Sequence, residues 1–248
     1  MIFFTGIQVL KHAAKVDYCF ISINRFVGVN KRRKDFDVKT WILDSGAFSQ
    51  VFKSGDHTLT AQEYAVQIDR WSRCGILARA VSQDYMCEDF ILKKLGRTVK
   101  EHQDMTISNF RNLISEMKKI KSGTQIMPVL QGYEPEEYAD HLRSYGDLIP
   151  DYSWVGLGSV CKRNKNPESI SNVIDSVLDV NPTLRLHGFG VKKTSLAYER
   201  IRGRLFSSDS MAWSFDARYG GRCPHDPDEA IRFKNKIENM PVQMELIK

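Results

Sequence analysis

Short apolar runs bounded by turn residues alternate with amphipathic stretches along most of the chain. Apolar residues at helical spacing predict helices at Gln8–Val16, Thr60–Arg73, Lys100–Ile120, Glu136–Ser144, Pro167–Leu178, Thr194–Arg202 and Pro227–Ile237. The β-branched and aromatic runs predict strands at Ile2–Ile7, Cys19–Ile23, Trp41–Ser45, Leu77–Gln83, Gln125–Gln131, Trp154–Ser159, Leu184–Phe189 and Leu205–Ser210.

This alternation of strands and helices predicts the fold class. Repeated strand–helix units favour an α/β fold, a single (β/α)8 TIM-type barrel that forms one domain over residues 1–248. The alternative is an open doubly wound sheet, but no Gly-x-Gly-x-x-Gly follows the first strand. Residues 24–40, after the second strand, show no helical pattern and are interpreted as a long functional loop.

Composition narrows the class of protein. The chain has 248 residues, of which 42% are hydrophobic and 27% charged, so it is a globular protein and not a disordered one. No apolar run is long enough to span a membrane, and the N-terminus does not resemble a secretion signal. The five cysteines are scattered and odd in number, which indicates free thiols in a reducing compartment. We therefore expect a cytoplasmic protein.

Carboxylates and an amide stand where the predicted strands end. Asp44, Asp84 and Asp209 each close a strand, and Gln131 closes another. Aspartate is a poor strand residue, so three of them at strand ends need a reason. In a TIM-type barrel the carboxyl ends of the strands carry the chemistry. Paired carboxylates there suit a reaction at an anomeric carbon, with one as nucleophile and the other as acid and base. The alternative is that each aspartate only caps the following helix.

Basic residues follow the same strand ends. The net charge is +6, which favours a polyanionic partner. On a barrel these groups would lie on the catalytic face and form the footprint expected for nucleic acid, although solvated loops are the alternative for any single group. The candidate nucleic-acid-binding residues are Lys31, Arg32, Arg33, Lys34, Lys162, Arg163, Lys192, Lys193, Arg218 and Arg222.

Other chemistry has weaker support. Cys223 and His225 could supply two zinc ligands, but no second pair stands at the usual spacing, so no metal site is predicted. A serine nucleophile would need a Gly-x-Ser-x-Gly elbow, and none is present. His187 lies within a predicted strand and is interpreted as a packed, hydrogen-bonded residue.

The strand-end motifs, in their order along the chain, resemble the tRNA-guanine transglycosylase superfamily, and most closely its DNA-acting branch, deazapurine-in-DNA protein A, which bacteriophages often carry. The family's Asp-Ser-Gly-Gly-aromatic and Val-Gln-Gly motifs, its Gly-Gly-Leu loop and its Met-Gly-hydrophobic-Gly stretch have counterparts here. These are Trp41-Ile-Leu-Asp-Ser-Gly-Ala-Phe48, Val129-Leu-Gln-Gly132, Val155-Gly-Leu-Gly-Ser-Val160 and Leu186-His-Gly-Phe-Gly190.

The resemblance implies a role for each matching residue. Asp209 matches the nucleophile and Asp44 the general acid and base. The residues matched to base binding are Phe48, which stacks on the base, Asp84 and Gln131, which read its edge, and Gly156, Leu157 and Gly158, whose backbone contacts its exocyclic groups. The implied reaction exchanges guanine in double-stranded DNA for a free 7-deazaguanine base such as 7-cyano-7-deazaguanine, without a cofactor. The guanine flips out of the duplex and a covalent aspartyl-deoxyribosyl intermediate forms.

The sequence also departs from the family pattern. The Cys-x-Cys-x-x-Cys…His zinc module of the tRNA enzymes is absent after the nucleophile, which favours DNA over tRNA. Gln50 follows Ser49, whereas the family has Gln directly after the aromatic residue, and Leu157 replaces the second glycine of its loop. Three alternatives stay open: a tRNA-guanine transglycosylase of the queuosine or archaeosine type, a non-catalytic nucleic-acid-binding barrel, and a glycosidase acting on small glycosides.

Overall fold

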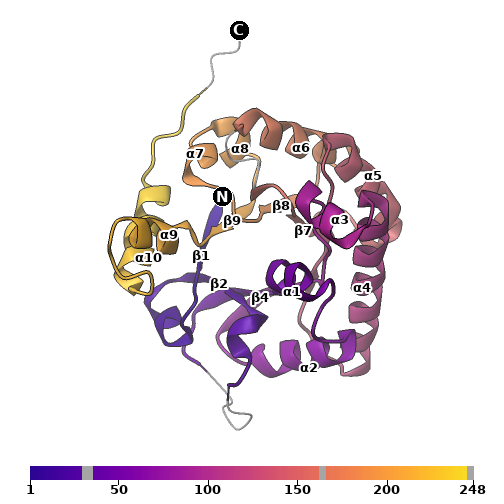
Figure 1. The fold of residues 1–248 in the computed structure, drawn as a ribbon, viewed down its shortest axis with the longest axis horizontal. Coiled ribbons are helices and arrows are strands. Elements are labelled where there is room, and N and C mark those ends of the chain that lie inside the picture. The colour runs from indigo at the N-terminus through magenta and orange to yellow at the C-terminus, as the bar shows by residue number, and fades with distance from the viewer. Residues whose placement is uncertain (30–35, 162–165, 245–248) are drawn as a thin grey trace. The chain divides into compact units, whose positions relative to one another are not determined.

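A computed structural model describes residues 1–29, 36–161 and 166–244 of the chain (Figure 1). Its strands are β1 (Ile2–Gly6), β2 (Tyr18–Ser22), β3 (Thr40–Asp44), β4 (Ile76–Val81), β5 (Ile126–Met127), β6 (Val129–Leu130), β7 (Trp154–Leu157), β8 (Arg185–Gly188) and β9 (Ser207–Ser210). Its helices are α1 (Ala47–Ser54), α2 (Ala61–Trp71), α3 (Asp89–Leu95), α4 (Val99–Lys119), α5 (Pro135–Tyr145), α6 (Pro167–Val180), α7 (Lys193–Leu196), α8 (Glu199–Arg202), α9 (Ala212–Tyr219) and α10 (Pro227–Glu238). Short 3-10 helices are η1 (Leu10–Lys15), η2 (Ile23–Phe26) and η3 (Gly146–Leu148).

The strand order confirms the predicted fold class. In the described part of the chain the sheet runs β5-β4-β3-β2-β1-β9-β8-β7-β6, the order of a TIM-like α/β barrel. The predicted strand Gln125–Gln131 is instead two short strands, β5 and β6, separated by Pro128. Proline has no backbone N–H to donate to a ladder, so it interrupts the strand there.

The chain divides into two compact units. We call Ile7–Val129 the N-terminal unit, and Met1–Gly6 together with Leu130–Lys248 the C-terminal unit. A single domain over residues 1–248 stays a prediction.

Aromatic packing forms much of the core of the N-terminal unit. The ring of Phe26 lies 4.5 Å from that of Trp71, and the ring of Phe36 meets Trp41 edge-on at 5.3 Å. The Trp41 indole N–H donates to the backbone carbonyl of Cys74 at 2.7 Å, which satisfies its one polar group. Trp41 lies on β3, so this packing fixes the strand that ends at Asp44.

In the C-terminal unit a polar strand is buried among apolar neighbours. Strand β9 has the sequence Ser-Ser-Asp-Ser, and all four residues are buried. It pairs in parallel with β1, where Phe4 lies opposite Asp209, and with β8. Helices α5 and α6 lie side by side on this unit, in the pink to orange part of Figure 1.

Capping chemistry sets several helix starts. A capping box of Thr60 and Glu63 starts α2, with the Glu63 backbone N–H donating to Thr60 Oγ1 at 3.2 Å. Asp226 caps α10 by accepting from the Asp228 backbone N–H at 2.9 Å. These local signals were readable in the sequence because each involves residues two or three positions apart.

Some predicted elements differ from those found. The pattern at Gln8–Val16 gives a 3-10 helix, η1, and the pattern at Thr194–Arg202 gives two short helices, α7 and α8. The sequence did not predict α1, α3 and α9, which have only seven or eight residues each and so carry little periodicity. None of the helices in the described ranges is both long and apolar enough to cross a membrane.

Candidate active site

Asp44 ends β3 beside a turn that only glycine suits. The backbone N–H of Gly46 donates to Asp44 Oδ2 at 3.1 Å. Gly46 has a φ of 74°, and a Cβ atom there would lie 2.4 Å from Asn24 Nδ2. Both the left-handed backbone and the close approach therefore require glycine in the Asp-Ser-Gly motif.

Gln50, in α1, holds the turn at Gly46 through hydrogen bonds. Its Nε2 donates to Asn24 Oδ1 at 2.7 Å, and its Oε1 accepts from the Thr58 backbone N–H at 2.8 Å. Asn24 in turn donates to the Gly46 carbonyl at 3.3 Å. This partly buried network holds the start of α1 against η2, so Gln50 positions the turn that carries Asp44. The sequence singled out Gln50 only as a departure from the family pattern.

Phe48 lies in the first turn of α1, directly after the Asp44 turn. Its side chain is 46% exposed and stacks on Phe52 with ring centroids 6.1 Å apart and ring planes within 5°. A ring supported on one side and exposed in part is suited to stack on a planar ligand.

Asp84 follows β4 and is buried. Ser45 Oγ lies 3.5 Å from Asp84 Oδ1, so the structure brings together the segments that follow the neighbouring strands β3 and β4. The Asp84 backbone carbonyl accepts from His57 Nε2 at 3.0 Å. Burial lowers the pKa of His57, whose Nδ1 is buried without a partner among the described residues. His57 therefore acts as a neutral donor that holds the Asp84 segment.

Tyr64 lies next to the same carboxylates. Its hydroxyl donates to the Val81 carbonyl at 3.0 Å. Burial, followed by the charges of Asp44 and Asp84, raises the pKa of Tyr64 well above its ordinary value. Tyr64 thus stays protonated and structural.

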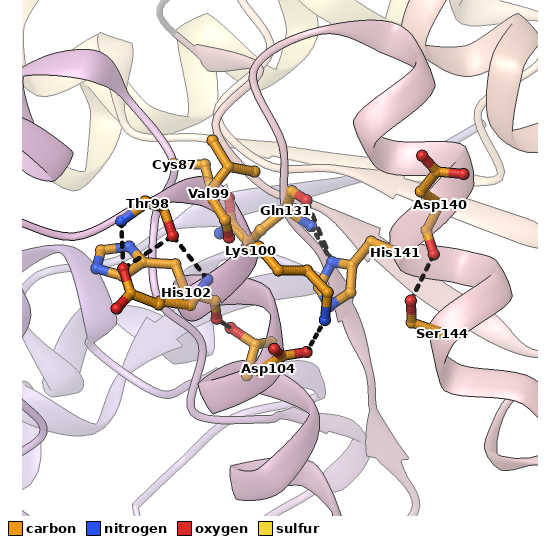
Figure 2. A network of polar contacts seen from close by, with 12 residues as sticks. Cys87, Thr98, Val99, Lys100, His102, Asp104, Gln131, Asp140, His141 and Ser144 are labelled. Carbon is orange, nitrogen blue, oxygen red and sulfur yellow. Dashed lines mark hydrogen bonds and ion pairs between the residues drawn. The ribbon is translucent and has the colours of Figure 1, made fainter.

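In the C-terminal unit, Gln131 directly follows β6 and is held by its neighbours. Its backbone N–H donates to His141 Nδ1 at 2.9 Å (Figure 2), so that ring nitrogen is the acceptor. Its Oε1 accepts from Ser159 Oγ at 2.7 Å. A Cβ atom on Gly158 would lie 2.1 Å from Gln131 Nε2, so the amide packs directly on that glycine.

The loop matched to backbone recognition follows β7. A Cβ atom on Gly156 would meet the Phe189 ring at 2.3 Å, and the Gly158 carbonyl accepts from the Tyr138 hydroxyl at 2.8 Å. The Leu157 side chain is buried, which leaves only its backbone for a ligand. The glycines therefore let two neighbouring side chains, Phe189 and Gln131, approach this backbone closely.

Asp209 is the third residue of β9 and is buried except for a small part. Its Oδ1 accepts from the Gly190 backbone N–H at 3.1 Å and lies 3.2 Å from His187 Nε2. Its Oδ2 accepts no hydrogen bond from the described residues. Asp216, seven residues further along the chain, is exposed on α9 and serves below as a control. One carboxylate oxygen is thus fixed by two donors while the other keeps its lone pairs.

His187 is a site residue whose role the sequence did not show. The prediction that it is packed and hydrogen-bonded is confirmed, but its partner is the Asp209 carboxylate. The structure pairs His187 on β8 with Ser207 on β9, two residues before Asp209, and no local sequence pattern shows this register.

The basic candidates fall into two groups. Lys192, Lys193, Arg218 and Arg222 are all exposed in the C-terminal unit. Arg222 Nε donates to Glu229 Oε1 at 2.7 Å, and both residues line a cavity of about 340 Å³ that Lys193 and Lys236 also line. The remaining candidates, Lys31, Arg32, Arg33, Lys34, Lys162 and Arg163, lie outside the described residues.

Helix α9 also exposes two aromatic residues that the sequence analysis did not select. Phe215 is more than half exposed, and Tyr219 is 88% exposed. The Arg218 guanidinium lies 5.9 Å from the centroid of the Phe215 ring. Aromatic and cationic side chains together suit contact with nucleic-acid bases and phosphates.

Comparison with known proteins assigns the family. Among the described residues no group of three His, Cys, Asp or Glu side chains is placed to hold a metal ion. No curated protein matches the chain. The model of the family DpdA, DeoxyPurine in DNA protein A, matches residues 9–231, a range that includes Asp44, Asp84, Gln131 and Asp209. The chain therefore belongs to the DpdA family, whose members act in the insertion of deazapurines into DNA.

Proposed function

We propose that this protein exchanges guanine in DNA for a 7-deazaguanine base, such as 7-cyano-7-deazaguanine, through a covalent aspartyl-deoxyribosyl intermediate. The observation that carries the proposal is the state of Asp209, with two donors near Oδ1 and none among the described residues on Oδ2. A carboxylate held in this way is suited to attack carbon. Membership of a deazapurine-in-DNA family supports deoxyribose C1′ as that carbon.

The proposed reaction has two displacements. The target guanine leaves the duplex stack, at a cost of a few kcal/mol. Asp209 Oδ2 bonds to C1′, the bond from C1′ to guanine N9 breaks, and guanine leaves with a proton that protonated Asp44 donates. The incoming base then loses its N9 proton to Asp44, and N9 attacks C1′ as the bond to Asp209 breaks. Two inversions at C1′ retain the β configuration, as in retaining glycosidases.

Base recognition is proposed for the remaining matched residues. Asp84 and Gln131 read the hydrogen-bonding edge of the base, and the backbone of Gly156, Leu157 and Gly158 contacts its exocyclic groups. Phe48 stacks on the ring. Fixed partners on several of these groups support the proposal, because a site with preset donors and acceptors rejects a base that leaves them unpaired.

The exposed cations contact the phosphates of double-stranded DNA in this proposal. Lys192, Lys193 and Arg218 have exposed side chains, and Arg222 adds charge next to Glu229. Tyr219 and Phe215 on α9 supply aromatic surface for unstacked bases. The four basic residues Lys31–Lys34 are proposed to act in the same way.

The test is a covalent trap with matched aspartate variants. Wild-type protein, Asp209→Asn and Asp216→Asn are incubated with labelled guanine and either DNA or unmodified tRNA, and adducts are separated by denaturing electrophoresis. We expect wild type and Asp216→Asn to label DNA and form a DNA-linked band, and Asp209→Asn to bind DNA without forming one. A DNA-linked band from Asp209→Asn would contradict the assignment of the nucleophile. Labelling of tRNA alone would contradict the DNA substrate.

A further inference from the structure

A chain of buried polar groups leads to the nucleophile that the proposed function assigns. His187 has no exposed surface. Its Nδ1 lies 2.8 Å from Ser207 Oγ, and its Nε2 lies 3.2 Å from Asp209 Oδ1. The Trp154 indole N–H reaches the same Ser207 Oγ at 2.9 Å. Four side chains from β7, β8 and β9 thus form one continuous line of polar contacts.

The chemistry of the four groups sets the direction of the hydrogen bonds. An indole N–H can only donate and an ionised carboxylate can only accept. Nε2 faces the Asp209 carboxylate, which can only accept, so Nε2 carries a proton. We assign His187 Nδ1 as the acceptor of the Ser207 hydroxyl proton, and the Ser207 oxygen accepts from the Trp154 N–H. The order is Trp154 to Ser207 to His187 to Asp209.

This line resembles a Ser-His-Asp triad, but its geometry excludes that function. Ser207 is fully buried, so its hydroxyl cannot reach a substrate. Its oxygen is also occupied by the Trp154 N–H. In a hydrolase the imidazole takes the proton of an accessible serine as general base. Here the exposed end of the line is the aspartate, so the line serves Asp209.

We propose that His187 is the positioning residue for Asp209 and that it holds the carboxylate with Oδ2 directed at the substrate carbon. The proposal rests on the proposed function. The Gly190 N–H and the His187 Nε2–H both reach Oδ1, which fixes the carboxylate plane and leaves the attacking oxygen uncovered. A partial rotation of the carboxylate away from this orientation would break both bonds. A preset nucleophile of this kind lowers the barrier to attack.

Methionine is the matched substitution at position 187. A methionine thioether cannot donate a hydrogen bond. His187→Met therefore removes the contact to Asp209 Oδ1 and keeps a side chain of similar size.

The experiment compares His187→Met with His187→Gln. Glutamine is chosen because its terminal amide N–H replaces the Nε2 donor, whereas methionine fills similar space without donating. We expect His187→Met to lower kcat for labelled-guanine exchange into DNA about 10- to 100-fold with KM unchanged, since hydrogen bonds to charged groups are the stronger ones. His187→Gln should recover kcat to within about fivefold of wild type. Three results would overturn the proposal. They are an equal loss of kcat in both folded variants, an effect on KM in place of kcat, and a wild-type kcat in His187→Met.

A second measurement separates this inference from the reaction itself. Nitrogen NMR of the imidazole should show His187 protonated at Nε2 and bare at Nδ1. A proton on Nδ1 would overturn the assignment regardless of activity. A wild-type protein that has the expected tautomer but exchanges no base, on DNA or tRNA, would refute the proposed function and leave the contact to Asp209 in place.

Discussion

Replacement of Gly158 by alanine tests how the Gln131 amide is held. The added Cβ would lie 2.1 Å from Gln131 Nε2 and 2.4 Å from its Cδ. The backbone of Gly158 cannot yield easily, because its N–H donates to the Leu130 carbonyl at 2.9 Å and its carbonyl accepts from Tyr138 at 2.8 Å. The Gln131 amide must therefore move away from Ser159. Loss of that bond in a buried site costs about 1–3 kcal/mol, so we expect the free energy of unfolding to fall by that amount.

The assay is urea unfolding of four proteins: wild type, Gly158→Ala, Gln131→Ala and the double variant. Removing the amide first also removes the clash, so Gly158→Ala should cost less than about 0.5 kcal/mol in the Gln131→Ala background. Gly123→Ala is the matched control, because nothing lies within 4 Å of a Cβ atom at that position. Additive effects of the two substitutions would refute the packing argument. In the exchange assay we expect Gly158→Ala to raise KM for free guanine while DNA affinity stays unchanged.

Two further predictions concern pH and DNA contact. Burial lowers the pKa of His57, so the unfolded chain binds a proton more readily and the free energy of unfolding should fall as the pH drops below about 6.5. His57→Gln keeps a donor to the Asp84 carbonyl and should reduce the difference in the free energy of unfolding between pH 7.5 and 5.5, measured by urea unfolding. An unchanged difference would contradict this prediction. Tyr219→Ala should weaken duplex DNA binding about tenfold in fluorescence anisotropy. The control is Tyr152→Ala, which removes a tyrosine that lies before β7 and is 67% exposed, and it should leave duplex DNA binding unchanged. Equal losses of affinity in the two variants would count against α9 as the contact surface.

The sequence predicted those features of the site that depend on where a strand ends. Asp44 closes β3, and Asp209 lies one residue before the end of β9. Asp44 directly ends an apolar run, whereas Asp209 comes three residues after the apolar pair Leu205 and Phe206. The requirement for glycine at position 46 was also visible as a motif, although its physical reason, a φ of 74° beside Asn24, needed the structure.

Contacts between distant segments could not be predicted from local patterns. Gln50 reaches back 26 residues to Asn24, and His187 reaches forward 22 residues to Asp209. Periodicity and capping rules describe neighbours within about one helical turn, so they carry no information on such pairs. The division of the predicted strand Gln125–Gln131 into β5 and β6 could have been predicted from the sequence, because Pro128 stands in the middle of that run.

Strand β9 shows why the nucleophile could be both buried and placed well. Serine and aspartate are poor strand residues, and buried polar groups without partners are costly. Each serine here has a partner: Ser207 contacts Trp154 and His187, Ser208 donates to the Gly188 carbonyl at 2.8 Å, and Ser210 accepts from the Ala212 N–H at 3.1 Å. Local preference alone argues against a strand at this position, and only the neighbouring elements make it stable. Such conflicts between local sequence and fold are expected at functional sites, which supports β9 as the strand that carries the reaction.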